Sequence, residues 1–178
     1  MANVIFIPDG TTETQFTQDA GDLLILGAGD SLSVDGAPAV ELEEPNTALS
    51  NDGAISATGA PAVIGDEASV RIVNGSNDPA ASITSDTTAI LLEPLNGNTQ
   101  EITNLATIDG AFNGIDFQGA PGSSAKLFNV GLVTSESRAL NIVGDGVQVV
   151  NTGTIETTAD PRNGVVYTDT AADNTTIV

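Results

Sequence analysis

The phrase Gly-Ala-Pro-Ala-Val occurs twice, at residues 36–40 and 59–63, and weaker copies recur about every 25 residues to the end of the chain. Each copy has a small residue, an aliphatic residue, a variable residue and usually another apolar residue. A fixed period of this length is typical of stacked supersecondary units, each of which buries its apolar face only against its neighbours. The sequence therefore predicts a repeat protein with an inward ladder of Val40, Val63, Ile90, Ile115, Leu140 and Val165.

Two further columns run parallel to the first. An asparagine also recurs about once per unit, and an aliphatic residue stands two positions before it. These aliphatic residues, with Ile177 in the last unit, predict a second inward ladder of Leu49, Ile72, Ile102, Leu127, Val149 and Ile177. The other column follows each asparagine and consists of Ile55, Ile83, Ile108, Val133 and Ile155. These segments alternate with a period of two, as half-buried strands do, and turn-forming residues separate them.

Three short strands per unit predict an all-β fold, a single-stranded parallel β-helix of about six coils. A coil of about 22 to 30 residues is longer than the roughly 18 residues of a hexapeptide solenoid, which favours the right-handed form. We expect residues 1–22 to form an N-terminal cap, with a strand over residues 4–7 and Phe16 folded over the core, because a solenoid needs its first coil covered. Residues 23–178 then form the β-helix repeats, as part of a longer array.

The asparagine series consists of Asn51, Asn74, Asn104, Asn129 and Asn151. In stacked coils identical side chains lie above one another, so the amides are expected to hydrogen-bond along a ladder. Asparagine also tolerates the left-handed backbone conformation that ends a strand sharply. We therefore interpret these residues as turn-formers rather than as binding residues.

Composition excludes several kinds of chemistry. The chain has no cysteine and no histidine, which removes disulfides, thiolates, Ser-His nucleophile pairs and His-containing metal sites. Its net charge of −20 with only four basic residues argues against nucleic-acid and anionic-membrane partners. The apolar stretch near the first residue is too short for a signal peptide or a membrane span, so we expect no membrane insertion.

No catalytic, cofactor-binding or metal-ligating residue is assigned from the sequence, and no cofactor is expected. Residues 27–32, Gly-Ala-Gly-Asp-Ser-Leu, resemble one calcium-binding nonapeptide of a calcium roll, but such a roll needs tandem copies. A flat ice-binding face would need a regular outward Thr array. The columns of Thr103, Thr107 and Thr154 contain other residue types instead.

A carbohydrate-acting β-helix, of the polysaccharide lyase, epimerase or phage tailspike type, is the alternative function. Such enzymes place carboxylates in a groove on one face. Asp109, Asp116 and Glu136 are the candidates here, with Tyr167 expected nearby. The outward column through Asp116 holds only one acid per several coils, so we expect Asp116 to be a solvated strand residue.

The stretch VVNTGTIETTADPRNGVVY at residues 149–167, with weaker relatives from residue 48 onward, resembles the β-helical passenger repeats of bacterial surface and secreted proteins. These include autotransporter-like passengers and large type I secreted repeat proteins. The resemblance implies an extracellular or cell-surface location. Because the N-terminal residues do not have the pattern of a signal peptide, we expect a signal-peptide-independent route to that location. Adhesion, scaffolding and assembly are the roles that it implies.

The sequence thus favours a non-enzymatic extracellular module that serves as a stalk, surface layer, filament or adhesin scaffold. We expect end-to-end self-association through residues 175–178, because the last strand has an unpaired edge, and a glycan or surface partner. Insertions at residues 75–81, 93–99 and 156–163 are interpreted as surface decoration, with binding as the alternative. An outward row of Arg71, Glu101 and Lys126 is expected to alternate in charge.

Overall fold

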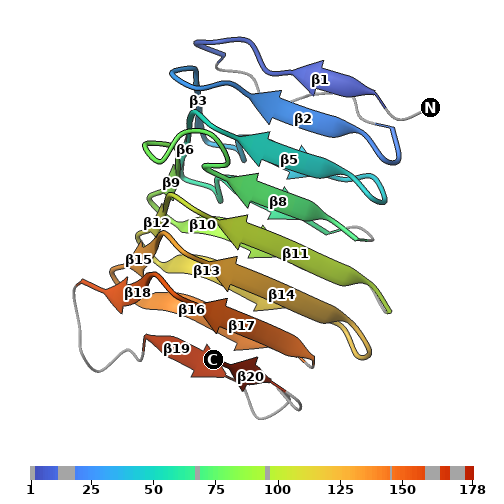
Figure 1. Cartoon of the computed structure of the whole chain (residues 1–178), viewed down its shortest axis with the longest axis vertical. Coiled ribbons are helices and arrows are strands. Elements are labelled where there is room, and N and C mark those ends of the chain that lie inside the picture. The colour runs from blue at the N-terminus through green and yellow to red at the C-terminus, as the bar shows by residue number, and fades with distance from the viewer. Residues whose placement is uncertain are drawn as a thin grey trace.

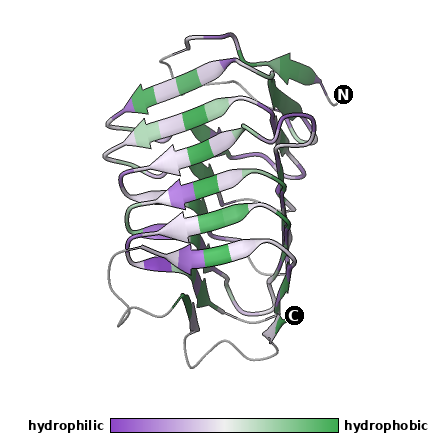
Figure 2. Ribbon diagram, turned by 60° about the vertical axis from the view of Figure 1, so that its left-hand side comes forward, coloured by the Kyte–Doolittle hydropathy of each residue, from purple (hydrophilic) through white to green (hydrophobic). Residues whose placement is uncertain are grey.

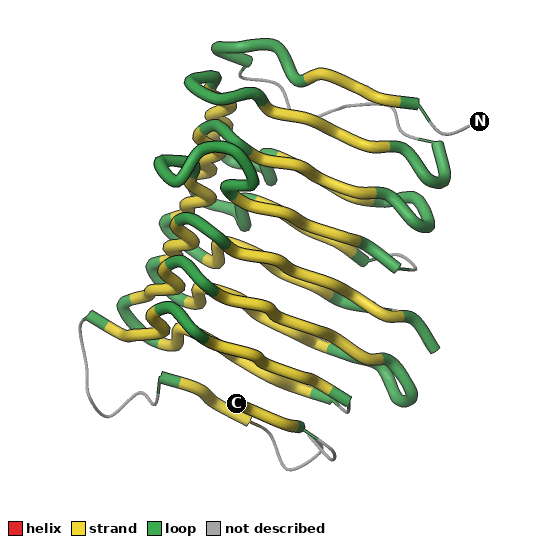
Figure 3. Tube along the Cα trace, in the orientation of Figure 1, coloured by secondary structure: helices red, strands yellow, loops and turns green. Residues whose placement is uncertain are grey.

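The computed structural model describes residues 3–11, 19–66, 69–94, 97–144, 146–158, 165–168 and 175–178. These residues form a parallel β-solenoid of about six turns, in which three sheets wrap around one narrow core (Figure 1). In the described residues strands alternate with loops, and these residues contain no helix (Figure 3). The expected all-β parallel β-helix is confirmed.

Each of the six complete coils contributes one strand to each sheet, and β1 and β20 extend sheet A at its two ends. Sheet A contains β1 (Val4–Phe6), β2 (Leu23–Leu26), β5 (Ala48–Asn51), β8 (Arg71–Asn74), β11 (Thr99–Asn104), β14 (Ser124–Asn129), β17 (Val147–Asn151) and β20 (Thr176–Ile177). Sheet B contains β3 (Ser31–Asp35), β6 (Ala54–Thr58), β9 (Ser82–Ser85), β12 (Thr107–Gly110), β15 (Leu132–Ser135) and β18 (Thr154–Thr157). Sheet C contains β4 (Val40–Leu42), β7 (Val63–Gly65), β10 (Thr88–Leu92), β13 (Asn113–Gln118), β16 (Arg138–Val143) and β19 (Val166–Thr168).

The path of the chain gives the coil its hand. In Figure 1 the chain runs to the left along sheet A at the front, turns back through sheet B, returns to the right along sheet C behind, and descends by one strand. This path is a right-handed coil, as the coil length predicts.

Stacked aliphatic ladders fill the core. The second predicted ladder pairs in register from Leu49 through Ile72, Ile102, Leu127 and Val149 to Ile177. The first ladder pairs in register from Val40 to Leu140, and the third from Ile55 to Ile155. Most of these side chains are fully buried, so each coil covers the apolar layer of the next.

The last rung of the first ladder differs from the prediction. Val166, rather than Val165, pairs with Leu140 and packs against the core, whereas Val165 is 38% exposed. Two consecutive valines fit the sequence pattern equally well, and a shift of one residue moves a side chain to the opposite face of a strand. The predicted position of Val165 in the core is therefore wrong.

The asparagines end the strands of sheet A and form the expected ladder. The Nδ2 atom of Asn51 donates to Oδ1 of Asn74 at 2.8 Å, and the same bond repeats at 2.9, 2.8 and 2.7 Å down to Asn151. Their left-handed interpretation is wrong, because Asn46 and Ser69 are the only described residues other than glycine with a positive φ. The side chains end the strands by hydrogen bonding, since Nδ2 of Asn51 also donates to the carbonyl oxygen of Ser82.

The N-terminal segment joins the solenoid directly. Strand β1 pairs in register with β2, and Thr11 bridges to Leu32 in sheet B. The strand predicted over residues 4–7 is thus present at Val4–Phe6 and adds a rung to sheet A. Phe16, predicted to cover the core, lies outside the described residues.

Candidate functional site

Asp116 lies on the outer face of sheet C and is nevertheless 5% exposed. Its Oδ2 accepts hydrogen bonds from Nδ2 of Asn113 at 3.0 Å and from Nε2 of Gln118 at 3.1 Å. Its Oδ1 accepts one from Nδ2 of Asn141, on the next coil, at 2.7 Å. The expectation of a solvated strand residue is therefore wrong, because three amides surround the carboxylate.

Tyr167 extends this polar network along the same column. It pairs with Asn141 in the sheet, and the guanidinium carbon of Arg138 lies 4.3 Å from the centre of its ring. Arg138 also donates to Oδ1 of Asn141 at 3.3 Å. Tyr167 thus lies two strands from Asp116 in the same column, with Asn141 between them. The amides that link them were not predicted from the sequence, because their contacts depend on the register between coils.

Asp109 belongs to sheet B, whereas Asp116 belongs to sheet C. Burial raises the pKa of Asp109, and the negative charge of Glu136 raises it further. The register of sheet B places the two residues on adjacent strands, because Asp109 pairs with Thr134, two residues before Glu136. A carboxylic acid whose pKa is raised is the group that glycoside-cleaving enzymes use as a general acid.

The six strands of sheet B, which form one stack in Figure 2, contain many Ser and Thr residues. The column of Thr107 contains Ala54 and Leu132, which confirms that its Thr array is interrupted. A neighbouring column of Ser33, Ser56, Thr84 and Thr134, interrupted by Asp109, was missed in the sequence. It was missed because it mixes Ser with Thr.

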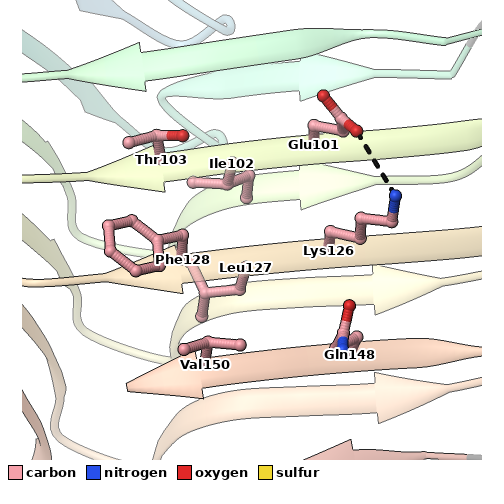
Figure 4. Close-up of a pocket in the computed structure, with 8 residues that line it drawn as sticks. All are labelled: Glu101, Ile102, Thr103, Lys126, Leu127, Phe128, Gln148 and Val150. Atoms are coloured by element: carbon pink, nitrogen blue, oxygen red, sulfur yellow. Dashed lines mark ion pairs between the residues drawn. The ribbon is translucent and has the colours of Figure 1, made fainter. Parts of the chain in front are cut away.

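The outer face of sheet A carries a shallow hollow of about 220 Å³ (Figure 4). One side presents Phe128, which is 44% exposed and has Thr103 and Val150 as its neighbours on adjacent strands. The other side presents Glu101 and Lys126, whose Oε1 and Nζ atoms lie 3.7 Å apart in an ion pair. The lining residues are Glu101, Ile102, Thr103, Lys126, Leu127, Phe128, Gln148 and Val150.

The charged row predicted from the sequence lies on this face. Arg71, Glu101 and Lys126 occupy successive strands in register, as expected. Among the described residues, the ion pair of Glu101 is with Lys126, and Arg71 forms none. The eight strands of sheet A contain a single acid, Glu101, although the whole chain has 24. The strands of sheet B contain three acids and those of sheet C contain two, so sheet A has the fewest acidic residues in its strands.

The insertion at residues 75–81 is hydrogen-bonded to the equivalent turn of the preceding coil, through Asp52. Asp52 accepts hydrogen bonds from the hydroxyl of Ser76 at 3.1 Å and from the backbone N–H of Asn77 at 2.8 Å. Burial raises the pKa of Asp52, but the hydrogen bonds from Asn77 and Ser76 outweigh burial and hold that pKa below its ordinary value. Of the other two insertions, residues 95–96 and 159–163 lie outside the described part of the chain.

The described part of the chain contains neither a cluster of metal-ligating residues nor a membrane-spanning helix. Within these ranges no three Asp, Glu, His or Cys side chains gather into a group fit for a metal ion. In the calcium-like stretch, the carboxylate of Asp30 folds against Gly27, where a Cβ atom would lie 2.7 Å from Oδ2. The same ranges hold no helical segment with the length and hydrophobicity of a membrane crossing.

Comparison with protein-family models, with curated proteins and with solved structures found no match for this chain. The resemblance to β-helical passenger repeats is confirmed for the β-solenoid fold alone. Membership of a particular passenger family stays a prediction.

Proposed function

We propose that this chain is a non-enzymatic, extracellular structural module, a rod of the stalk, filament or surface-layer type that lengthens when copies stack end to end. The distribution of exposed apolar side chains supports this proposal. Nine large apolar residues of the described ranges are exposed, and six of them lie in or directly beside β1, β19 or β20: Val4, Phe6, Val165, Tyr167, Ile177 and Val178.

Ile177 supports the stacking most directly. It continues the inward ladder below Val149, yet it is 50% exposed because no described strand follows β20 in sheet A. At the opposite end, β1 continues the same ladder with Ile5, and among the described residues it pairs with a strand on one side only. Stacking β20 of one copy on β1 of the next would extend both the sheet and the apolar ladder.

Sedimentation velocity and negative-stain microscopy of the 178-residue chain test the proposal. We expect rods that lengthen with concentration. The variant Ile177→Asp should abolish this growth, because it buries a charge in the junction. Val130→Asp is the matched control, since Val130 is 44% exposed but lies in a lateral turn. A monomer at all concentrations, or equal loss in both variants, would contradict the proposal.

A carbohydrate-acting β-helix is the second candidate, and the raised pKa of Asp109 beside Glu136 is the observation that favours it. Release of reducing ends from a polysaccharide panel, compared between the parent chain and Asp109→Asn, tests this function. Activity that persists in Asp109→Asn would rule out Asp109 as the acid.

A further inference from the structure

The hollow on sheet A combines an aromatic ring with hydrogen-bonding groups of both kinds. The chain has only six aromatic residues, and Phe128 presents its ring to solvent near the middle of the sheet. Across the hollow, Glu101, Lys126 and Gln148 follow one another in register on β11, β14 and β17 (Figure 4). This column offers an acceptor, a donor and an amide that does both.

The chemistry of the hollow restricts the class of ligand that can bind there. An extended peptide cannot add as a strand here, because the backbone of β14 is already paired with β11 on one side and with β17 on the other. An anion gains little, because Glu101 offsets Lys126 and the whole chain carries −20. A purely apolar molecule would strip water from the ion pair. A neutral molecule with many hydroxyl groups and an apolar C–H face meets none of these penalties.

A second hollow adjoins the first and gives the site its length. Its volume is about 360 Å³, and Glu101 lines both hollows. The second hollow is lined by Asn46, Ala48, Ser69, Val70, Arg71, Thr99 and Glu101. The two hollows therefore form a track that crosses the strands of sheet A, with strands spaced at about 4.8 Å.

We infer that this track binds a neutral, linear oligosaccharide. One sugar ring stacks on Phe128, and its hydroxyl groups hydrogen-bond to Glu101, Lys126 and Gln148. Arg71 and Thr99 serve the next sugars in the second hollow. The inference does not depend on the stacking of copies, because Phe128 and this column point away from the core ladder that forms the junction.

An array of neutral glycans, with anionic glycans on the same slide, tests the inference with the full chain. We expect binding to at least one neutral linear glycan and weaker binding to anionic ones. Titration of the strongest neutral hit, followed by NMR, should shift the amide signals of β11, β14 and β17. Phe128→Ala should weaken binding at least about tenfold, as removal of a central aromatic contact does.

Phe112→Ala is the matched control, because Phe112 is 58% exposed and lies in the turn between β12 and β13. It should leave binding unchanged, and both variants should keep the parent's circular dichroism spectrum. Gln148→Ala should weaken binding without loss of fold. Absence of any neutral hit, preference for anionic glycans, or equal effects of the two Phe variants would overturn the inference. None of these results bears on whether copies stack end to end.

Discussion

The Nδ2 atom of Asn74 donates to Oδ1 of Asn104 at 2.9 Å across 30 residues of sequence. Both side chains are fully buried, and Asn104 passes the bond on to Asn129 at 2.8 Å. Each amide therefore acts as donor to one coil and acceptor from another. Such a chain of buried bonds is costly to interrupt, since every lost partner leaves a polar atom without solvent.

Asn104→Ala should accordingly destabilise the chain by about 2 to 4 kcal/mol, because it removes the partners of Asn74 and Asn129 together. Asn151→Ala should cost only about 1 kcal/mol, since Asn151 is half-buried at the end of the ladder. Urea unfolding of both variants measures the two costs. Equal costs would show that the amides act as independent turns rather than as a connected ladder.

The register of the last coil predicts different costs for two adjacent valines. Val166→Ala should destabilise by about 1 kcal/mol, because Val166 packs against the core, whereas Val165→Ala should stay within about 0.5 kcal/mol. Ile115→Ala, in the middle of the same ladder, should cost about 2 to 4 kcal/mol. Chemical denaturation of the three variants tests the register. A larger effect at Val165 than at Val166 would support the register predicted from the sequence, in which Val165 points inward.

Replacement of Asp116 tests the amides around its carboxylate. Asp116→Asn should destabilise by about 1 to 3 kcal/mol, because a neutral amide has one oxygen for three N–H donors. The exposed residue Glu156 provides the control, and Glu156→Gln should leave the thermal midpoint nearly unchanged. If Asp116→Asn leaves the stability unchanged, the three side-chain amides must hydrogen-bond to water instead.

Replacement of Asp52 and of Asp109 by Asn should change the stability at neutral pH in opposite directions, and both changes should shrink in acid. The folded-state pKa of Asp52 is lowered, so its carboxylate stabilises the fold above the unfolded-state value of about 4, and this contribution is lost as the pH falls through the folded-state pKa. Asp52→Asn should thus be less stable than the parent at neutral pH, with the difference shrinking in acid.

Asp109 provides the contrast, because its folded-state pKa is raised. Its ionised form disfavours the fold, so Asp109→Asn should be more stable than the parent at neutral pH and lose this gain as the pH falls below the folded-state pKa. Urea midpoints from about pH 7 to about pH 3 separate the two behaviours. Parallel curves for both variants would contradict the assigned directions.

The charged row on sheet A predicts a salt-dependent effect. Glu101→Lys sets three positive charges on successive strands and should cost about 1 kcal/mol or less at low ionic strength. The cost should shrink as salt approaches about 1 M, where the screening length is about 3 Å. Glu101→Gln, measured across the same salt series, separates loss of the ion pair from repulsion. A cost that is independent of salt would place its origin in packing.

The fold was predictable because its signals repeat. Aliphatic residues and asparagines recur once per coil, so the pattern that predicts each strand is present in every coil. The predicted register was wrong in the last coil, because Val165 and Val166 are adjacent β-branched residues and either one fits the single inward position. The environment of Asp116 was not predictable, because Asn141 belongs to another coil and looks like an ordinary exposed amide in the sequence. The hollow beside Phe128 likewise depends on neighbours from three coils.

The asparagine ladder tolerates coils of unequal length. Successive asparagines of the ladder are separated by 23, 30, 25 and 22 residues, yet the Nδ2–Oδ1 distances of their hydrogen bonds differ by only 0.2 Å. A segment that runs from one asparagine to the next is therefore an exchangeable unit, whatever its loop length. Duplication or deletion of such a segment leaves every asparagine inside the ladder with a partner above and below. Unequal recombination between two such genes can thus change the length of the solenoid in whole coils, while its loops diverge independently.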